Sequence, residues 1–519
     1  MKLLLSLPVL FLTIAATAQS SVDLTKNQVQ VAGGRLAGST APSGIHEFKG
    51  IPYAASPVGP RRWQTPQPVQ PWKDVRPAMQ FGPRPMQQPL YSDMNFRSPS
   101  VSEDCLYLNV WTGASASKER RPVLVYFYGG GFLAGDGSEL RYDGEGMAKR
   151  GIVAVTVNYR LGVFGFLAHP ELTKESAKHA AGNYGLLDQA AALRWVKDNI
   201  AAFGGDPQHI TIAGESAGSW SVSAQMASPL SKNLLSGAIA ESGSLLGLQP
   251  LPTLAQAEQM GAAFGVSLGA GSLAALRALP AQQLLEAAGK PDAPRFTAIV
   301  DGYFLPRPPA EIYAAGGQAA VPLLVGWNSL EMNYPAVLGP AAPTLANYQA
   351  AVQKLYGARA TEALRNYPAT TDAEVEQAAN ALASDRFIAY STWKLADAHG
   401  QTGDQPVYQY LFARARPAVP PAPAAAGAVH SAEIEYALGN LATNKVYSWT
   451  PDDYKLSEQM QSYFANFIKA SNPNGPGLPT WPAANRSPQG QILRLDVNTR
   501  VEPAAHRARY LFLEQATVK

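Results

Sequence analysis

The amino-acid sequence predicts an α/β fold in which a mostly parallel central sheet is flanked by helices and interrupted by long loop and helical insertions. Short runs of β-branched and aromatic residues are typical of buried strands; they occupy residues 123–128, 152–158, 210–213, 237–241, 321–325 and 408–412. Helical patterns alternate with these runs, notably over residues 186–203 and 458–470. Near-continuous apolar strands that alternate with helices indicate a parallel sheet covered on both faces.

The first 18 residues have the pattern of a secretory signal peptide. Lys2 is followed by a mostly apolar run over residues 3–14 and then by Ala-Thr-Ala, a small-x-small cleavage pattern. The run is too short to span a membrane, and no later run is long enough for a transmembrane helix. Nothing between residues 30 and 519 has the composition of an interdomain linker. We therefore expect residues 1–18 to be removed on export to the periplasm or the extracellular space, and residues 19–519 to form one domain without a transmembrane anchor.

The charge and the cysteine content exclude two further classes. The formal net charge is +3 and no cluster of Lys or Arg occurs, so we expect no nucleic-acid partner, because phosphate neutralisation needs clustered cations. Cys105 is the single cysteine, so no intrachain disulfide can form and stability must come from the core. Its alternating, strand-like surroundings over residues 105–111 favour a small buried apolar side chain over a nucleophile.

Three successive glycines, Gly129 to Gly131, follow the expected strand at residues 123–128. Glycines let backbone N–H groups turn toward a ligand, so this loop is suited to donate hydrogen bonds to a developing oxyanion. Gly129-x-Gly131-x-x-Ala134 also fits the dinucleotide fingerprint, but the polar, glycine-rich residues 135–144 do not predict a helix that could hold a pyrophosphate. No other cofactor motif and no metal-ligand spacing occurs, so we expect neither a cofactor nor a metal.

The motif G-x-S-x-G at residues 214–218 is the most informative part of the chain. A strand is expected before Ser216 and a helix after it, so the serine would lie on a sharp strand-to-helix turn. Glycines two residues before and after it remove the side chains that would clash there, and the hydroxyl would be exposed above the sheet edge. This context favours a serine nucleophile over a plain Gly/Ser turn, although a nucleophile also needs a base, an acid and an oxyanion hole.

Two carboxylates downstream of Ser216 are placed to orient a histidine base. Glu331 follows the expected strand at residues 321–325 across a short turn, where a carboxylate can accept a hydrogen bond from imidazole. Asp301 lies in Val-Asp-Gly, which is typical of a tight turn. The residues alone leave both acids open.

Three of the seven histidines follow the acids in the order expected for this serine turn: His399, His430 and His506. His430 comes directly after residues 413–428, whose prolines exclude a helix or a central strand and predict a surface loop. Such a loop can carry imidazole over the sheet edge. His399 ends a helical pattern, where we expect a surface residue, and His506 lies in an Arg-bearing tail. The position favours His430 and leaves the other two as alternatives.

Together these segments resemble the type-B carboxylesterases, the carboxylesterase/lipase family that includes the cholinesterases, within the α/β-hydrolase fold. Residues 203–218 (FGGDPQHITIAGESAG) are similar to the serine-site signature of the family, and residues 103–110 (EDCLYLNV) to its second signature. Residues 50–54 (GIPYA), 158–162 (NYRLG) and 182–189 (GNYGLLDQ) also match, in the same order along the chain. The resemblance covers nearly the whole chain after the signal peptide and implies one α/β-hydrolase catalytic domain.

The resemblance implies a role for each matching residue. Ser216 matches the nucleophile, Glu331 the acid and His430 the base. The supporting positions it implies are the oxyanion-hole donors Gly130, Gly131 and Ala217, the network serine Ser242, and Glu215, which would tune local electrostatics. Three positions depart from the family: Tyr128 stands where many relatives have His, Met332 where Gly is common, and Pro85 at the usual partner of Cys105, so the family disulfide is absent.

These assignments imply a serine hydrolase that cleaves small-molecule carboxylic esters through an acyl-enzyme. Phe132, Trp220 and Trp327 neighbour the catalytic positions and are candidates for either the substrate pocket or the core. One alternative is a non-catalytic, cholinesterase-like binding or adhesion protein, although such relatives typically lack a triad residue. Others are a lipase, an amidase or a polyester hydrolase with the same site. Neither the substrate nor the oligomeric state is indicated by the sequence.

Overall fold

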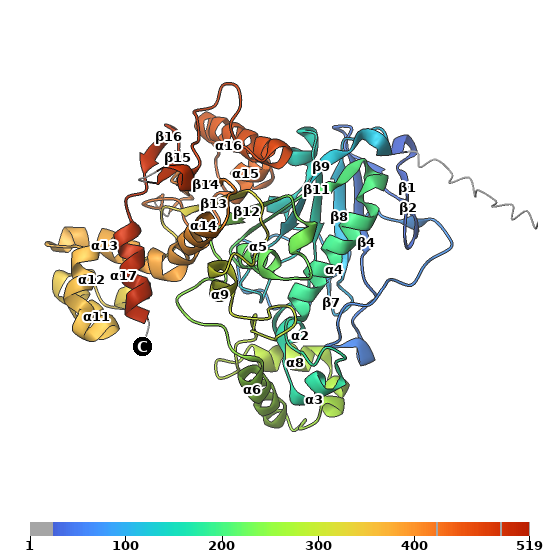
Figure 1. Cartoon of the computed structure of the whole chain (residues 1–519), viewed down its shortest axis with the longest axis horizontal. Coiled ribbons are helices and arrows are strands. Elements are labelled where there is room, and N and C mark those ends of the chain that lie inside the picture. The colour runs from blue at the N-terminus through green and yellow to red at the C-terminus, as the bar shows by residue number, and fades with distance from the viewer. Residues whose placement is uncertain (1–23, 422–423, 488–489, 518–519) are drawn as a thin grey trace, which may run out of the picture.

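A computed structural model of the chain describes residues 24–421, 424–487 and 490–517. Its centre is a mixed sheet with the strand order β16-β15-β14-β13-β12-β11-β9-β10-β8-β4-β3 (Figure 1). The expected signal peptide lies outside the described residues. No helix in the described ranges is both long enough and apolar enough to cross a membrane.

The middle of the sheet is parallel and its two ends are antiparallel. Neighbouring strands from β10 to β15 run parallel, whereas β8 pairs with β10 and β4, β3 pairs with β4, and β15 pairs with β16 in antiparallel fashion. The parallel strands are β9 (Arg121–Phe127), β10 (Val153–Val157), β11 (Gly205–Glu215), β12 (Gly237–Glu241), β13 (Leu323–Asn328), β14 (Val407–Phe412) and β15 (Gln491–Leu495). The end strands are β3 (Ser39–Thr40), β4 (His46–Pro52), β8 (Tyr107–Thr112) and β16 (Arg500–Pro503). The predicted mostly parallel sheet is confirmed.

Helices cover both faces of the sheet. On one face α4 (Tyr184–Asn199) and α5 (Ala217–Ala227) pack on β11, and α14 (Tyr390–Thr402) packs on β13 and β14 (Figure 1). On the other face α1 (Glu145–Lys149) contacts β10 and α16 (Pro451–Ala470) contacts β9. The central strands are therefore buried on both sides, as their continuous apolar sequences require.

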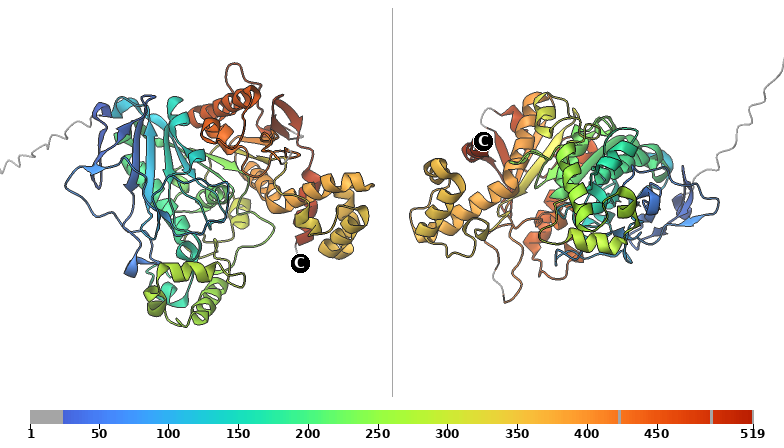
Figure 2. Two further views of the ribbon diagram at one scale, coloured as in Figure 1. Left: turned by 180° about the vertical axis from the view of Figure 1, so that it is seen from behind. Right: turned by 90° about the horizontal axis from the view of Figure 1, so that it is seen from below.

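Two helical insertions extend from the sheet. Between β12 and β13 the chain forms α6 (Leu254–Ser267), α7 (Leu273–Ala278), α8 (Ala281–Ala288) and α9 (Pro309–Ala314). Between β13 and β14 it forms α10 (Pro335–Leu338), α11 (Leu345–Tyr356), α12 (Ala360–Asn366), α13 (Asp372–Ser384) and α14. Figure 2 shows α11 to α13 beside the C-terminal helix α17 (Arg507–Thr517), as a group next to the β13 and β14 side of the sheet. This group has a hydrophobic cluster of its own, which includes Trp327, Tyr348 and Tyr510.

The expected elements are present with shifted boundaries. The pattern at residues 186–203 is α4 followed by a 3₁₀ turn over Ile200–Phe203. The helix expected at residues 458–470 begins earlier, at Pro451, because Thr450 caps it: its hydroxyl accepts from the N–H of Asp453, and the Asp453 carboxylate accepts from the N–H of Thr450. Residues 413–421 and 424–428 contain no helix or strand, as their prolines predict.

The parallel order brings four strand ends to one edge of the sheet. Gly214 pairs with Phe127, Glu215 with Glu241, and Glu241 with Gly326, so β9, β11, β12 and β13 end side by side. The segments that follow these strands contain the glycine loop, Ser216, Ser242 and Glu331. In open α/β sheets ligands bind outside the carboxyl ends of the strands, so this edge is where a site is expected.

Candidate active site

Ser216 lies on a strained turn between β11 and α5. Its φ angle is 58°, in the left-handed region that residues other than glycine rarely adopt. Its backbone N–H donates to the Glu241 carbonyl at 2.9 Å, which fixes the turn to the end of β12. A side chain at Gly214 would lie 2.6 Å from the Gly218 backbone, and one at Gly218 would clash with the Phe127 carbonyl oxygen. Both glycines of the motif are therefore required by close packing.

The structure brings Ser216, His430 and Glu331 together. The Nε2 atom of His430 lies 3.0 Å from the Ser216 hydroxyl, and its Nδ1 lies 2.6 Å from Oε2 of Glu331. Both distances are those of hydrogen bonds. Because the carboxylate accepts at Nδ1, the proton belongs on that nitrogen and Nε2 is free to accept from the serine.

A contact between two loops places His430 beside Glu331. The Leu330 N–H donates to the Ala428 carbonyl at 2.8 Å, and the Ala428 N–H donates to the Ser329 hydroxyl at 3.0 Å. A side chain at Gly427 would lie 2.7 Å from that hydroxyl, so the loops meet closely. The end of the proline-rich loop thereby packs on the turn that contains Glu331.

Glu331 is held in place by hydrogen bonds to its second carboxylate oxygen, Oε1. Oε1 accepts from the Asn328 N–H at 2.7 Å and from the Ser242 hydroxyl at 2.7 Å. Glu331 is 3 % exposed, so these bonds replace water around its charge. The Ser242 hydroxyl also lies 3.2 Å from Glu433, which accepts from the Asn328 side-chain amide at 2.5 Å. Glu331 thus belongs to a buried polar network.

Three further buried carboxyl groups surround the site. Burial raises the pKa of Glu215 to about 8, and burial together with the charge of Glu331 raises the pKa of Glu433 to about 7. Burial and the charge of Glu433 also raise the pKa of Glu241, which accepts a hydrogen bond from Tyr126 at 3.1 Å. Burial therefore disfavours the ionised form of each of these three carboxyl groups.

The pKa of His430 is set by opposing effects. Burial lowers it, but the negative charges of Glu215 and Glu331 raise it to about 10. Oε1 of Glu215 lies 3.2 Å from Nε2 of His430. The imidazolium is thus strongly stabilised when its carboxylate neighbours are ionised, and less so when Glu215 carries a proton.

The glycine loop lies directly over the serine turn. A side chain at Gly129 would lie 3.1 Å from Cβ of Ser216, and Gly130 and Gly131 have φ angles of 101° and 66°. The backbone N–H groups of Gly130, Gly131 and Ala217 have no hydrogen-bond partner among the described residues. Free donors beside a nucleophile can bind a developing oxyanion.

The three aromatic residues that are candidates for the substrate pocket or the core lie in different surroundings. Phe132 is fully buried under the glycine loop and packs edge-on against Trp220, with ring centroids 5.7 Å apart. Trp220 is partly exposed beside Gly243. Trp327 packs edge-on against Tyr510, 6.2 Å away, and lines a separate cavity.

Sequence reasoning missed other side chains near the triad. The exposed ring of Phe387 lies 5.1 Å from the His430 ring, edge-on. The Tyr91 hydroxyl and the Met94 methyl group lie 3.4 Å and 3.1 Å from where side chains at Gly131 and Gly130 would begin. Both residues belong to an irregular loop, and Phe387 to a π-helical turn, so no periodic pattern could have marked them. Glu241 and Glu433 have a simple signal, because they lie one residue before Ser242 and three after His430.

The remaining candidates lie elsewhere. His399 is buried and its Nε2 lies 2.8 Å from the Val321 carbonyl, so the expected surface position is wrong, because α14 packs that side of the helix on the chain before β13. Asp301 accepts from the N–H groups of Tyr303 and Leu305, as a turn-forming aspartate does. Cys105 is free and buried. No group of three or more metal-ligating side chains occurs in the described ranges.

Comparison with known proteins identifies the family of the chain. The Carboxylesterase family model matches residues 25–513. Fumonisin B1 esterase from Sphingopyxis macrogoltabida is 35% identical over 86% of this chain and 83% of its own. Para-nitrobenzyl esterase from Bacillus subtilis is 34% identical over 92% of this chain and 97% of its own. The crystal structure of Geobacillus stearothermophilus carboxylesterase EST55 at pH 6.2 superposes with a TM-score of 0.81 at 34% identity, over 94% of this chain and 100% of that one.

These matches confirm the resemblance and the predicted fold. The glycine loop, the strained serine and the loop-borne histidine lie in a chain whose relatives are esterases along nearly its whole length. The protein has the α/β-hydrolase fold, belongs to the carboxylesterase family, and is a carboxylesterase.

Proposed function

We propose that this carboxylesterase cleaves small-molecule esters with Ser216 as nucleophile, His430 as base and Glu331 as the acid that orients the base. The observation that carries the proposal is the unbroken chain of contacts from the serine hydroxyl to His430 at 3.0 Å and from His430 to Glu331 at 2.6 Å. Nucleophile, base and orienting acid in hydrogen-bond reach of one another are the signature of covalent serine catalysis.

In the acylation step Oγ of Ser216 bonds to the ester carbonyl carbon while Nε2 of His430 takes the hydroxyl proton. The carbonyl electron pair moves to oxygen, and the resulting oxyanion is stabilised by the N–H groups of the glycine loop and of Ala217. The tetrahedral intermediate then expels the alcohol oxygen, which receives the proton from His430. Glu331 stabilises the imidazolium that exists between these two proton transfers.

Deacylation repeats the same proton transfers with water. His430 takes a proton from water, whose oxygen attacks the acyl carbon, and then returns that proton to Oγ of Ser216 as the bond to the acyl group breaks. The products are a carboxylic acid and the regenerated enzyme. Each catalytic side chain returns to its starting protonation state at the end of the cycle.

The mouth of the site supports a preference for esters with an apolar group. Phe387 and Tyr91 are 40 % and 43 % exposed, and both lie beside the catalytic residues. Their rings offer apolar surface to an acyl or alcohol group. Rates on para-nitrophenyl esters of short and long acyl chains, and on matching anilides, separate an esterase from a lipase or an amidase.

The decisive experiment replaces the nucleophile. Ser216→Ala should lower kcat by about 10⁴-fold or more without unfolding the protein, and should abolish labelling by a fluorophosphonate probe. Ser236→Ala is the matched control, because the buried Ser236 hydroxyl has no partner among the described residues. Undiminished hydrolysis by Ser216→Ala would overturn the mechanism. An inactive His506→Ala beside an active His430→Ala would overturn the assignment of the base.

We also propose that the enzyme is exported to the periplasm or the extracellular space. The support is the leading Lys2, the apolar run over residues 3–14 and the small-x-small pattern before Gln19. Mass spectrometry of the protein from fractionated cells should find a mature chain that begins at Gln19 outside the cytoplasm. Retention of the intact chain in the cytoplasm would contradict this proposal.

A further inference from the structure

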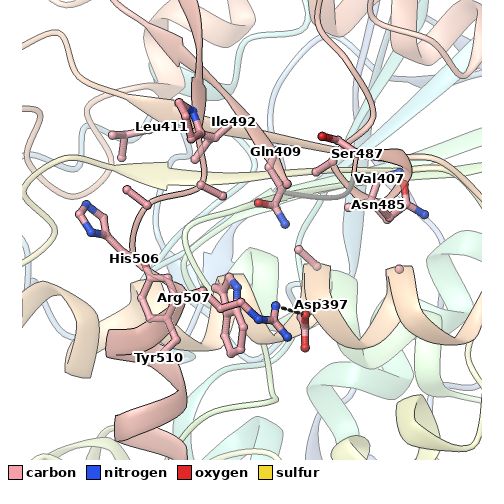
Figure 3. A pocket seen from close by; sticks show the side chains of 18 of the residues that line it. Asp397, Val407, Gln409, Leu411, Asn485, Ser487, Ile492, His506, Arg507 and Tyr510 are labelled. Atoms are coloured by element: carbon pink, nitrogen blue, oxygen red, sulfur yellow. Dashed lines mark hydrogen bonds and ion pairs between the residues drawn. The ribbon is translucent and has the colours of Figure 1, made fainter. Parts of the chain in front are cut away.

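A cavity of about 350 Å³ lies between α14, the strands β14 and β15, and the start of α17 (Figure 3). Ser216, Glu331 and His430 are absent from its described lining. Trp327 of β13 forms part of the wall, whereas the side chain of its neighbour Asn328 bonds Glu433 in the active-site network. Successive side chains of a strand point to opposite sides. The cavity and the triad are therefore separated by β13.

The cavity walls are largely aromatic. Trp393 of α14 stacks on Tyr510 of α17 with ring centroids 5.1 Å apart and planes inclined by 23°, and Trp327 meets Tyr510 edge-on. Leu411 and Ile492 add aliphatic surface from β14 and β15. Its volume falls within the range of small-molecule sites. Flat aromatic walls favour a ligand that presents a π face of its own.

Several polar side chains of the cavity wall have no hydrogen-bond partner among the described residues. Gln409 points into it from β14, as Figure 3 shows, and is 8 % exposed, yet its side-chain amide has no hydrogen-bond partner among the described residues. Among the described residues, no hydrogen-bond partner occurs either for the indole N–H groups of Trp327 and Trp393 or for the hydroxyl of Tyr510. These three residues are at most 7 % exposed. None of these polar atoms is among the fully buried atoms without a partner, so each keeps accessible surface, and a ligand in the cavity can bond it in place of water.

The hydrogen-bond donors and acceptors on the cavity wall indicate which polar atoms a matching ligand must have. Two indole groups donate only, while the amide and the hydroxyl donate and accept. Donors therefore outnumber acceptors on the wall. A ligand that carries an acceptor oxygen, either a carbonyl or a hydroxyl, matches this set.

The charges at the rim already have partners. Asp397 and Arg507 pair with each other at 2.6 Å (Figure 3). Gln401 also donates to Asp397. Glu502 pairs with Arg500 at 2.5 Å. Burial and the neighbouring Arg509 lower the pKa of His506, so its imidazole is neutral near pH 7. The rim thus offers no net charge to a ligand.

We propose that this cavity is a second, non-catalytic binding site for a neutral aromatic molecule that carries a hydrogen-bonding oxygen, such as an aromatic ketone or a phenol. The inference is independent of the proposed catalytic mechanism, because Ser216, Glu331 and His430 do not belong to the described lining of the cavity.

The first test is a fluorescence titration of the full-length mature protein with 6-propionyl-2-(dimethylamino)naphthalene. This probe is a neutral aromatic ketone without an ester bond, and its emission shifts to the blue in an apolar site. We expect saturable binding of one probe per chain, with the same Kd after Ser216 is blocked by a fluorophosphonate. Loss of binding on blocking Ser216 would place the probe in the active site and overturn the proposal.

Variants of the cavity wall test the site without using Ser216. Gln409→Leu should raise the Kd of the probe about tenfold, because it removes one hydrogen bond to the ketone. Ala396→Phe places a ring in the cavity from α14 and should abolish binding. Gln353→Leu, at an exposed position of α11, is the matched control and should leave the Kd unchanged.

Two further readouts make the result unambiguous. Circular dichroism verifies the fold of each variant, and if Ala396→Phe does not fold, the Gln409→Leu titration and a co-crystal structure with the probe decide. Electron density for the probe between Trp327 and Gln409 supports the proposal. Density elsewhere, or a Kd that Gln409→Leu leaves unchanged, overturns it.

Discussion

Glu215 and His430 are in direct contact: Oε1 of the carboxyl group lies 3.2 Å from Nε2, the imidazole nitrogen that also faces the Ser216 hydroxyl. Glu215 is 3 % exposed, and Oε1 has no hydrogen-bond partner among the described residues. The ionised carboxylate of Glu215 stabilises the imidazolium of His430, whereas burial favours the neutral form of Glu215. The protonation of His430 is therefore coupled to that of Glu215, the residue next to Ser216.

The first prediction concerns the pH dependence of Glu215→Gln. The variant removes a negative charge that raises the pKa of His430. The imidazolium loses stabilisation, the pKa of His430 falls, and the neutral base persists to lower pH. The acid limb of the kcat/KM profile should therefore move to lower pH, by about one pH unit. Glu458→Gln, at an exposed position of α16, is the control. An acid limb that stays in place or moves to higher pH contradicts the coupling.

The second prediction concerns the charge of the orienting acid. Glu331→Gln keeps the size of the side chain but removes the charge that faces Nδ1 of His430 at 2.6 Å. We expect kcat to fall by about 10⁴-fold with little change in KM, because the imidazolium is stabilised only during the proton transfers. Steady-state kinetics on a para-nitrophenyl ester measures both constants. A kcat within tenfold of the wild type would show that another group orients His430.

The third prediction compares two neighbouring glycines of the oxyanion loop. A side chain at Gly130 would clash with the Ala134 carbonyl oxygen, whereas the nearest atom to one at Gly131 is the Tyr91 hydroxyl at 3.4 Å. Both residues have positive φ angles, so both substitutions strain the backbone. Gly130→Ala should lower Tm and kcat more than Gly131→Ala, with kcat reduced about 10²-fold or more if one oxyanion donor is displaced. Equal effects of the two substitutions would contradict the packing of the loop.

Sequence reasoning located the central strands because they are buried on both faces. The runs that became β9 to β14 are nearly continuous in apolar residues, and each lies within a few positions of the observed strand, except that β11 begins at Gly205. The end strands are harder to predict. Strand β16 has only exposed or half-buried residues, and β3 has two residues, so neither carries an apolar pattern. Their pairing depends on tertiary contacts.

The site was predictable where local geometry constrains the sequence. The glycines around Ser216 are required by backbone contacts within a few residues, so they leave a recognisable motif. Leu330 and Ala428 are in contact but lie far apart in the sequence, so their contact leaves no local sequence pattern. For that reason the residues alone left His399 and His506 open, and the family resemblance was needed to single out His430. The buried network through Glu433 depends on the same long-range contact.

The last prediction concerns a buried ion pair that joins the sheet to α4. The Nε and Nη2 atoms of Arg160 donate to the carboxylate of Asp188 at 2.8 and 2.7 Å, and the Arg160 backbone N–H donates to it at 3.0 Å. The side chains are 3 % and 0 % exposed. Asp188→Asn leaves the guanidinium buried without its counter-charge, so we expect the free energy of unfolding to fall by about 3–5 kcal/mol.

A surface pair provides the matched comparison for this loss. Arg120 pairs with Asp206 at the same distance of 2.7 Å, but its side chain is 59 % exposed. Water and salt screen such a pair, so Arg120→Ala should cost less than about 1 kcal/mol. Urea unfolding followed by circular dichroism measures both variants under the same conditions. Equal losses would contradict the larger contribution expected of the Arg160–Asp188 pair, which is less exposed and makes more hydrogen bonds than the Arg120–Asp206 pair.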